Sequence, residues 1–115
     1  MDALRDPENG TISPTRLAAH LHLSMEGLAD LTQLRVGVLL SSAASPRVQA
    51  RLRPIVTVLM RASRLVDDDE GLVVYWFRNE LLAGFDGIRA IDLVKAGRQD
   101  AVLAFLDMVE NGVPA

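Results

Sequence analysis

The sequence predicts an all-α protein of about six or seven short helices. Apolar residues recur at spacings of three and four positions, the period of a helix with one buried face. Residues that start and end helices separate these stretches, and no run alternates apolar and polar positions between hairpin turns. Half of the 115 residues are apolar, enough to form a core in one domain or in two small subdomains.

The N-terminal part has the spacing of a helix-turn-helix unit. Residues 1–12 are polar and rich in turn formers, so we expect a flexible arm there. Ser13 followed by Pro14 predicts a first helix, and Ser24 is the expected N-cap of a second. A third short apolar segment runs from Leu34 to Leu40. Two short helices, a tight turn and a third helix are typical of this motif.

A long linking helix is predicted from Pro46 to about Val66. Apolar residues recur along it at the spacing of one buried stripe. The stripe consists of Val48, Leu52, Ile55, Val56 and Leu59. Pro54 lies opposite this stripe on a helical wheel, where a kink can accommodate it. Region 13–66 therefore combines the helix-turn-helix part and the linking helix.

An acidic run, Asp67-Asp68-Asp69-Glu70, opens the C-terminal region, residues 67–115. Acids at a helix N-terminus complement the helix dipole, which we favour over the alternative of a metal site. Adjacent acids on a helical turn point in different directions, and the spacing of a calcium loop is missing. The next helix is predicted from about Glu70 to Leu81, and it carries three of the five aromatic residues, Tyr75, Trp76 and Phe77.

A shaped loop, Ala83 to Gly87, follows this helix. A short helix is then predicted from Ile88 to Lys95, with Gly97 at its C-terminal cap. The last helix is expected from about Gln99 to Glu110, burying Val102, Phe105, Leu106 and Val109. A short tail lies beyond it.

Charge differs between the two halves of the chain. The net charge is −3; residues 1–66 hold eight arginines and five acids, which gives +3, and residues 67–115 hold four basic residues and ten acids, which gives −6. This asymmetry predicts that the two halves meet different partners, although chance and helix capping are an alternative explanation.

Several classes of protein and site are disfavoured. The chain has no cysteine, which excludes disulfides, thiolate zinc sites and a cysteine nucleophile. No signal peptide or membrane-spanning run is evident, so we expect a cytoplasmic protein that does not bind a membrane. His20 and His22 are two positions apart on a predicted helix and face different directions. With no convergent acid, base or nucleophile, we expect no enzymatic activity, no catalytic or metal-binding residues and no cofactor.

DNA binding through the N-terminal part is an open question in the sequence. The third segment offers few polar residues for reading base edges; Arg35 is the main candidate. Arg47 and Arg51 on the linking helix are candidates for phosphate contacts, although such residues also commonly form a solvated face. The apolar residues Val36 to Leu40 indicate a core or an oligomer surface instead.

The segment from Trp76 reads WFRNELLAGFDGIRAIDLVKAGRQDAVLAFLDMVENG. It combines an aromatic pair followed by Asn79, the loop Gly84-Phe85-Asp86-Gly87, then Asp92-Leu93-Val94, Gly97-Arg98, an apolar helix and Gly112. These features resemble the toxin-binding domain of the MbcA/ParS/Xre antitoxin family. Residues 45–56 resemble the family's linking helix, and residues 13–40 loosely resemble its Xre-like helix-turn-helix region. Ile88-Arg89-Ala90 departs from the family's usual Arg/Lys-Thr-Pro/Ala stretch.

The resemblance implies an antitoxin of a type II toxin–antitoxin system. Its partner would be a RES-domain toxin, an enzyme that consumes NAD or transfers its ADP-ribose, and the antitoxin would cover the active site. A homodimer or a toxin–antitoxin hetero-oligomer is expected. The alternative is a transcriptional autoregulator that binds operator DNA.

The expected toxin-binding residues lie in the C-terminal region. They are Phe77, Arg78, Asn79, Gly84, Phe85, Asp86, Gly87, Arg89, Gly112, Val113, Pro114 and Ala115. Trp76 and Phe77 point about 100° apart on a helix, and we favour Trp76 in the core and Phe77 toward the partner. Phe85 either contacts the partner or plugs the core beneath its loop, and Arg78 and Asn79 have capping as an alternative role. The tail, residues 112–115, either inserts into a cleft or is disordered until bound.

Overall fold

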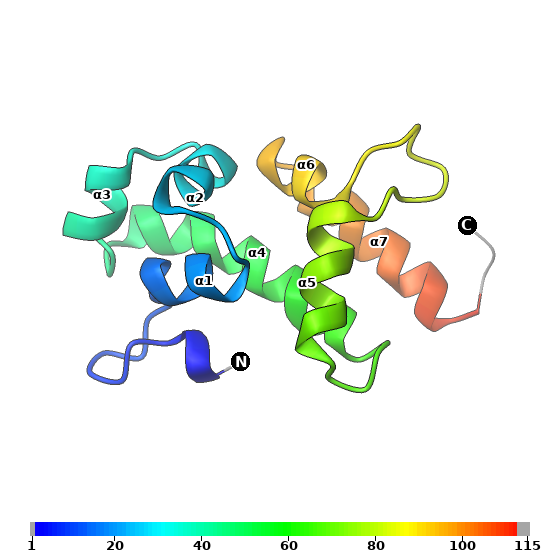
Figure 1. Cartoon of the computed structure of the whole chain (residues 1–115), viewed down its shortest axis with the longest axis horizontal. Helices are drawn as coiled ribbons and strands as arrows, with labels where there is room; N and C mark the ends of the chain where they lie inside the picture. Colours follow the sequence, from blue (N-terminus) through cyan, green and yellow to red (C-terminus); the bar gives the residue numbers. More distant parts are fainter. Residues whose placement is uncertain (1, 113–115) are drawn as a thin grey trace. The chain divides into compact units, whose positions relative to one another are not determined.

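Seven α-helices and one short 3-10 helix form the regular structure of residues 2–112, the part of the chain that the computed structural model describes (Figure 1). The 3-10 helix spans Asp2–Leu4. The α-helices are α1 (Pro14–His20), α2 (Met25–Thr32), α3 (Val36–Ser41), α4 (Pro46–Ser63), α5 (Glu70–Asn79), α6 (Ala90–Lys95) and α7 (Gln99–Glu110). The only β pairings within residues 2–112 are two isolated bridges. The predicted all-α fold is confirmed.

The chain divides into two compact units, Met1–Val56 and Thr57–Ala115. In the first unit, α1 packs against α2, α3 and the 3-10 helix; in the second, α6 packs against α5 and α7. The division lies inside α4, before the predicted boundary between residues 66 and 67. The reason is that the last turns of α4 supply core and ion-pair residues to the second unit, among them Arg61 and Ala62.

The N-terminal arm is folded, so the prediction of a flexible segment over residues 1–12 is wrong for the described residues 2–12. Leu4 and Ile12 are 3% and 2% exposed. The chain reverses between them, with an isolated bridge joining Arg5 and Ile12. The buried Gln49 side chain on α4 accepts a hydrogen bond from the Ile12 N–H (3.0 Å) and donates one to the Ile12 carbonyl (2.8 Å). Two buried apolar residues and the Gln49 hydrogen bonds therefore hold this mostly polar segment in place.

The starts of α1 and α2 follow the predicted caps, and α4 has a cap of the same kind. The hydroxyl oxygens of Ser13 and Ser24 accept hydrogen bonds from the Arg16 and Gly27 N–H groups at the beginnings of α1 and α2. Ser45 accepts one from Val48 at the beginning of α4. Each hydroxyl satisfies a backbone donor that has no partner within its helix.

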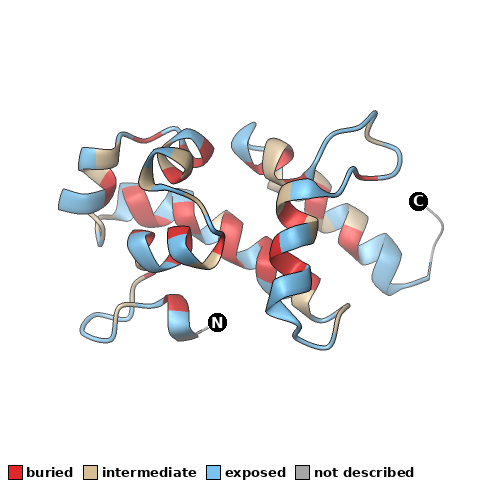
Figure 2. Cartoon of the chain, viewed as in Figure 1, coloured by how far each residue is buried: buried red, intermediate tan, exposed pale blue. Residues whose placement is uncertain are grey.

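The stripe predicted on α4 forms buried core. All five of its residues, Val48, Leu52, Ile55, Val56 and Leu59, are at most 6% exposed. Figure 2 shows buried positions along α4 in red. Pro54 lies within the helix and is half-buried, consistent with its position away from the stripe. One helix therefore supplies core residues to the first unit and then to the second.

Several helix ends differ from their predicted positions. α4 ends at Ser63 rather than near Val66, because Asp67 and Asp68 adopt left-handed conformations (φ 50° and 61°) and the Asp68 N–H bonds to the Ser63 carbonyl. α5 ends at Asn79 rather than Leu81, and α6 begins at Ala90 rather than Ile88. Residues 80–81 and 88–89, which were predicted to be helical, belong instead to the loop between α5 and α6. A bridge between Leu81 and Arg89 joins the two ends of this loop.

Candidate functional site

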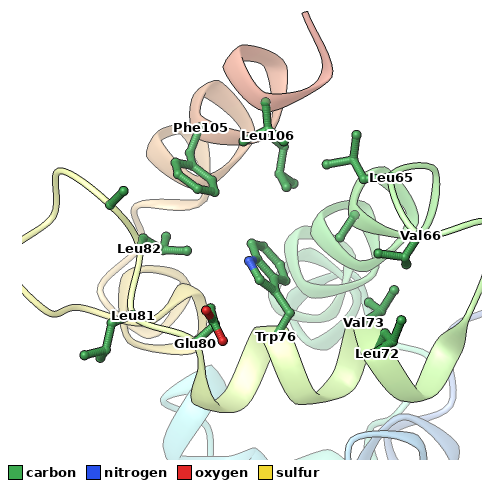
Figure 3. A pocket seen from close by; sticks show the side chains of 13 residues that line it. Leu65, Val66, Leu72, Val73, Trp76, Glu80, Leu81, Leu82, Phe105 and Leu106 are labelled. Atoms are coloured by element: carbon green, nitrogen blue, oxygen red, sulfur yellow. The ribbon is translucent and has the colours of Figure 1, made fainter. Parts of the chain in front are cut away.

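An apolar groove of about 450 Å³ opens in the second unit, and we call it the α5–α7 groove (Figure 3). Its walls come from α5, α7, the end of α4 with the turn after it, and the segment that follows α5. The lining residues are Ala62, Leu65, Val66, Leu72, Val73, Trp76, Glu80, Leu81, Leu82, Ala83, Phe105, Leu106 and Val109. Glu80 is the one charged residue among them, so the surface suits an apolar occupant.

Helical spacing explains how the sequence builds this groove. Leu72 and Trp76 are four positions apart and share one side of α5, as residues at i and i+4 do, and Glu80 follows as the C-cap residue of the helix. Phe105 and Val109 have the same spacing on α7. The structure corrects their predicted burial: Phe105 is half-buried and Val109 is 44% exposed. With Leu72 at 54% and Leu81 at 61%, the groove presents large apolar side chains to solvent.

The aromatic pair on α5 takes the reverse of its predicted orientation. Phe77 is fully buried, so the prediction that it faces a partner is wrong. Trp76 is half-buried, and its indole points into the α5–α7 groove (Figure 3). The buried face of α5 is formed by Val73, Val74 and Phe77, and this spacing leaves Trp76 on the adjacent side of the helix.

Backbone hydrogen bonds close the loop between α5 and α6. Leu82 donates its N–H to the Ile88 carbonyl (2.9 Å), and Ile88 donates to the Phe85 carbonyl (3.1 Å). Gly84 and Gly87 have φ values of +84° and +78°, which glycine adopts without steric cost. The Phe85 ring meets Phe105 of α7 edge-on, with centroids 6.4 Å apart. Phe85 is half-buried, so contact with a partner and the alternative that it fills the core beneath its loop both stay predictions.

Arg89 ties the end of α5 to the beginning of α6. Its guanidinium donates to the Arg78 carbonyl (3.0 Å) and makes two hydrogen bonds of 2.9 Å to the two carboxylate oxygens of Asp92. The Asp92 carboxylate also accepts the Arg89 backbone N–H. Hydrogen bonding from the Arg89 side chain holds the pKa of Asp92 below its usual range. Arg89, a predicted partner contact, thus also has a structural role at the base of the loop.

Acidic side chains surround the α5–α7 groove unevenly. Asp107 and Glu110 on α7 both pair with Arg61, and Glu110 also lies 3.9 Å from Arg64. By contrast, exposed carboxylates next to the Val66 and Leu72 walls, and Glu80 itself, form no ion pair within the described part of the chain. These are Asp67, Asp68, Glu70 and Glu80. Asp69 is the N-cap of α5, where its side chain accepts from the Leu72 N–H. The predicted helix-starting role of the acidic run is therefore confirmed for Asp69.

The remaining predicted contact residues lie at the end of α5, in the loop that follows it, and after α7. Arg78 is half-buried, and the Asn79 amide donates to the Tyr75 carbonyl at the end of α5, which agrees with capping. Asp86 is exposed in the loop, and Gly112 is exposed just after α7. Val113, Pro114 and Ala115 lie outside the described residues. Sequence reasoning missed the groove residues Leu72, Leu81 and Val109, although the four-residue spacing on α5 was a usable signal for Leu72.

The predicted DNA contacts are all exposed in the first unit. Arg35 is the N-cap residue of α3, and Arg47 and Arg51 lie one turn apart on α4. The turn between α2 and α3 is tight, with Gln33 in a left-handed conformation (φ 57°). In α3, Leu39 is buried and Leu40 is 53% exposed, so only part of this apolar segment is open as a surface.

Within residues 2–112, no three histidine or acidic side chains come together in a way that would hold a metal ion. None of the helices in this part of the chain combines the length and the apolar composition that crossing a bilayer requires.

Comparisons with protein-family models, with curated proteins and with solved structures gave no match.

Proposed function

We propose that this protein is an antitoxin that neutralises a RES-domain toxin by binding it through the second unit. The observation that carries the proposal is the α5–α7 groove, an open apolar surface on a unit whose sequence resembles a toxin-binding domain. Soluble proteins rarely leave such apolar patches uncovered unless a partner binds there. The toxin's reaction, NAD consumption or ADP-ribose transfer, is what the resemblance implies for the partner.

The exposed apolar side chains supply the expected binding energy. Leu72, Leu81 and Val109 are 54%, 61% and 44% exposed. Full burial of such a side chain is worth about 1.5–3 kcal/mol. Because these side chains are already partly buried, binding would gain only part of that free energy. Trp76 adds an aromatic anchor, a residue type that often dominates interfaces.

Electrostatics favour the same assignment. The second unit, residues 57–115, carries a net charge of −4, because Arg61 and Arg64 add two positive charges to the −6 of residues 67–115. A cleft that binds the phosphates of NAD needs positive charge, and an acidic partner is drawn toward such a cleft. Binding of this unit over the cleft would exclude NAD and so stop the reaction.

Co-expression tests the proposal directly. A RES-domain toxin encoded beside this protein is expected to arrest growth alone, to be harmless with the full chain, and to co-purify with it as a stable complex. Toxicity that the full chain does not relieve would reject the proposal.

A shortened chain ending at Asn111 tests how the active site is covered. If the tail inserts into the cleft, this chain binds the toxin and fails to inhibit it. If it protects as well as the full chain, neutralisation depends on the folded part of the unit.

Operator binding by the first unit is the second candidate function. The exposed Arg35, Arg47 and Arg51, together with the tight turn between α2 and α3, favour it. A gel shift with the promoter of its own gene is expected to weaken steeply with salt and to be reduced in an Arg47→Ala, Arg51→Ala variant. Absence of binding at low salt, with and without toxin, would reject this function.

A further inference from the structure

The size of the α5–α7 groove limits what can occupy it. Its volume is about 450 Å³. A protein cavity of about 150 Å³ holds one benzene-sized group, so this groove has room for about three such groups. Two or three large apolar side chains projecting from one short peptide segment match this space.

The carboxylates next to the groove indicate which charges should flank the apolar residues of that peptide segment. In the sequence, Asp67, Asp68 and Glu70 lie between the lining residues Val66 and Leu72, and all three are exposed. Glu80 lines the groove itself (Figure 3). Carboxylates with no ion pair within the described residues repel an acidic segment and attract a basic one. A wholly apolar ligand would form no charge interaction with these carboxylates.

We propose that the α5–α7 groove receives a segment of the toxin that carries two or three large apolar side chains flanked by lysine or arginine. This inference rests on the proposed function, because it takes the toxin as the partner. It assigns recognition to Leu72, Trp76 and Leu81, of which none was among the contacts expected from the sequence. Binding here is separate from any insertion of the chain's tail.

The single tryptophan provides a selective reporter of the groove. The full chain, labelled with 5-fluorotryptophan, gives one fluorine resonance from position 76. A catalytically inactive RES-domain toxin encoded beside this protein is the probe. We expect the resonance to shift when the complex forms, and a photocrosslinker placed at Leu81 to capture a toxin segment with apolar and basic residues.

Matched substitutions separate the groove from its surroundings. Leu72→Lys and Leu81→Lys are expected to weaken toxin binding by roughly tenfold or more, as loss of an interface anchor does. Tyr75→Lys lies on the same helix, is 60% exposed and does not line the groove, so it should bind within about twofold of wild type. Circular dichroism verifies that each variant is folded.

The double variant Asp68→Lys, Glu80→Lys should slow association at low salt, and high salt should reduce this effect.

Other results would overturn the inference, and each points to a different explanation. A complex that forms with no fluorine shift and full affinity for Leu72→Lys places the interface elsewhere and leaves the proposed function intact. An acidic crosslinked segment contradicts the stated chemistry. A shift that depends only on protein concentration assigns the groove to a second copy of this chain, and a small molecule retained in native mass spectra assigns it to that ligand. Absence of any complex rejects both the inference and the proposed function.

Discussion

Phe77 and Trp76 are neighbours in the sequence with opposite roles in the second unit. Phe77 is fully buried in the core, whereas Trp76 lies on the groove. The sequence predicted that one would be core and the other exposed, because adjacent helical positions point about 100° apart. The assignment of Trp76 to the core and Phe77 to the partner was wrong, because the choice depends on how α5 packs against neighbours that are distant in the chain.

Phe77→Ala should therefore destabilise the protein strongly. Removing a buried phenylalanine leaves a cavity and typically costs about 3–5 kcal/mol. Urea denaturation monitored by circular dichroism measures the change. Tyr75→Ala, on the same helix and 60% exposed, is the matched control and should cost well under half as much. Equal losses for both variants would contradict the burial of Phe77.

The Arg89–Asp92 pair should make stability depend on pH at the acidic end. The pKa of Asp92 is lowered in the folded protein by hydrogen bonding from Arg89. The contribution is therefore present above the ordinary aspartate pKa, about 3.9, and is lost as pH falls through the lower folded value.

Asp92→Asn should be less stable than wild type at pH 7, by less than about 1 kcal/mol because the pair is partly exposed. Urea denaturation at a series of pH values should show this difference disappearing under acidic conditions. Asp86→Asn, an exposed loop carboxylate outside the pair, should show no such convergence. A difference that stays constant down to pH 2 would rule out ionisation of Asp92 as its cause.

At the scale of elements, helix boundaries with a local cap were more predictable than boundaries set by contacts with distant residues. Caps such as Ser13 and Ser24 act on N–H groups within three residues, so the sequence contains the whole signal. The end of α5 and the start of α6 depend on the Leu81–Arg89 bridge and on the bond from Arg89 to the Arg78 carbonyl. These interactions close a loop, and the local pattern does not reveal them.

The groove was not predictable for the same reason. Its walls come from helices separated by the whole loop and α6, and only folding brings them together. The sequence indicated that α5 and α7 have apolar faces, and it placed Phe105 and Val109 in the core. Their exposure on an open surface depends on how far apart α5 and α7 lie.

Gly87→Ala should destabilise the loop. Gly87 has a φ of +78°, and an L side chain in this region costs about 1 kcal/mol even though the added Cβ meets no neighbour. Thermal unfolding measures the effect. Gly37→Ala is a control with the opposite expected sign. Gly37 lies within α3 with open space around it, so alanine should stabilise the protein by about 0.5–1 kcal/mol. The same sign for both would contradict the left-handed conformation at Gly87.

At the scale of the whole molecule, the unit division inside α4 predicts which fragments fold. A fragment of residues 57–115 keeps Leu59 and Ala62 of the core and the Arg61 ion pairs with Asp107 and Glu110. It should be helical and should unfold cooperatively. A fragment of residues 67–115 lacks all of these and should have weaker helical circular dichroism and bind a hydrophobic dye. Equal behaviour of the two fragments would place the division after α4, as the sequence had predicted.

The continuity of α4 across the division also constrains how such chains can recombine during evolution. A crossover in the acidic run would separate the second unit from core residues such as Leu59 and Ala62, and would leave them on the other parent's sequence. A crossover before the last two turns of α4 transfers the unit with its core intact. Gene fusions that exchange the second unit between chains of this fold should therefore have their junctions within this helix rather than at the turn that follows it.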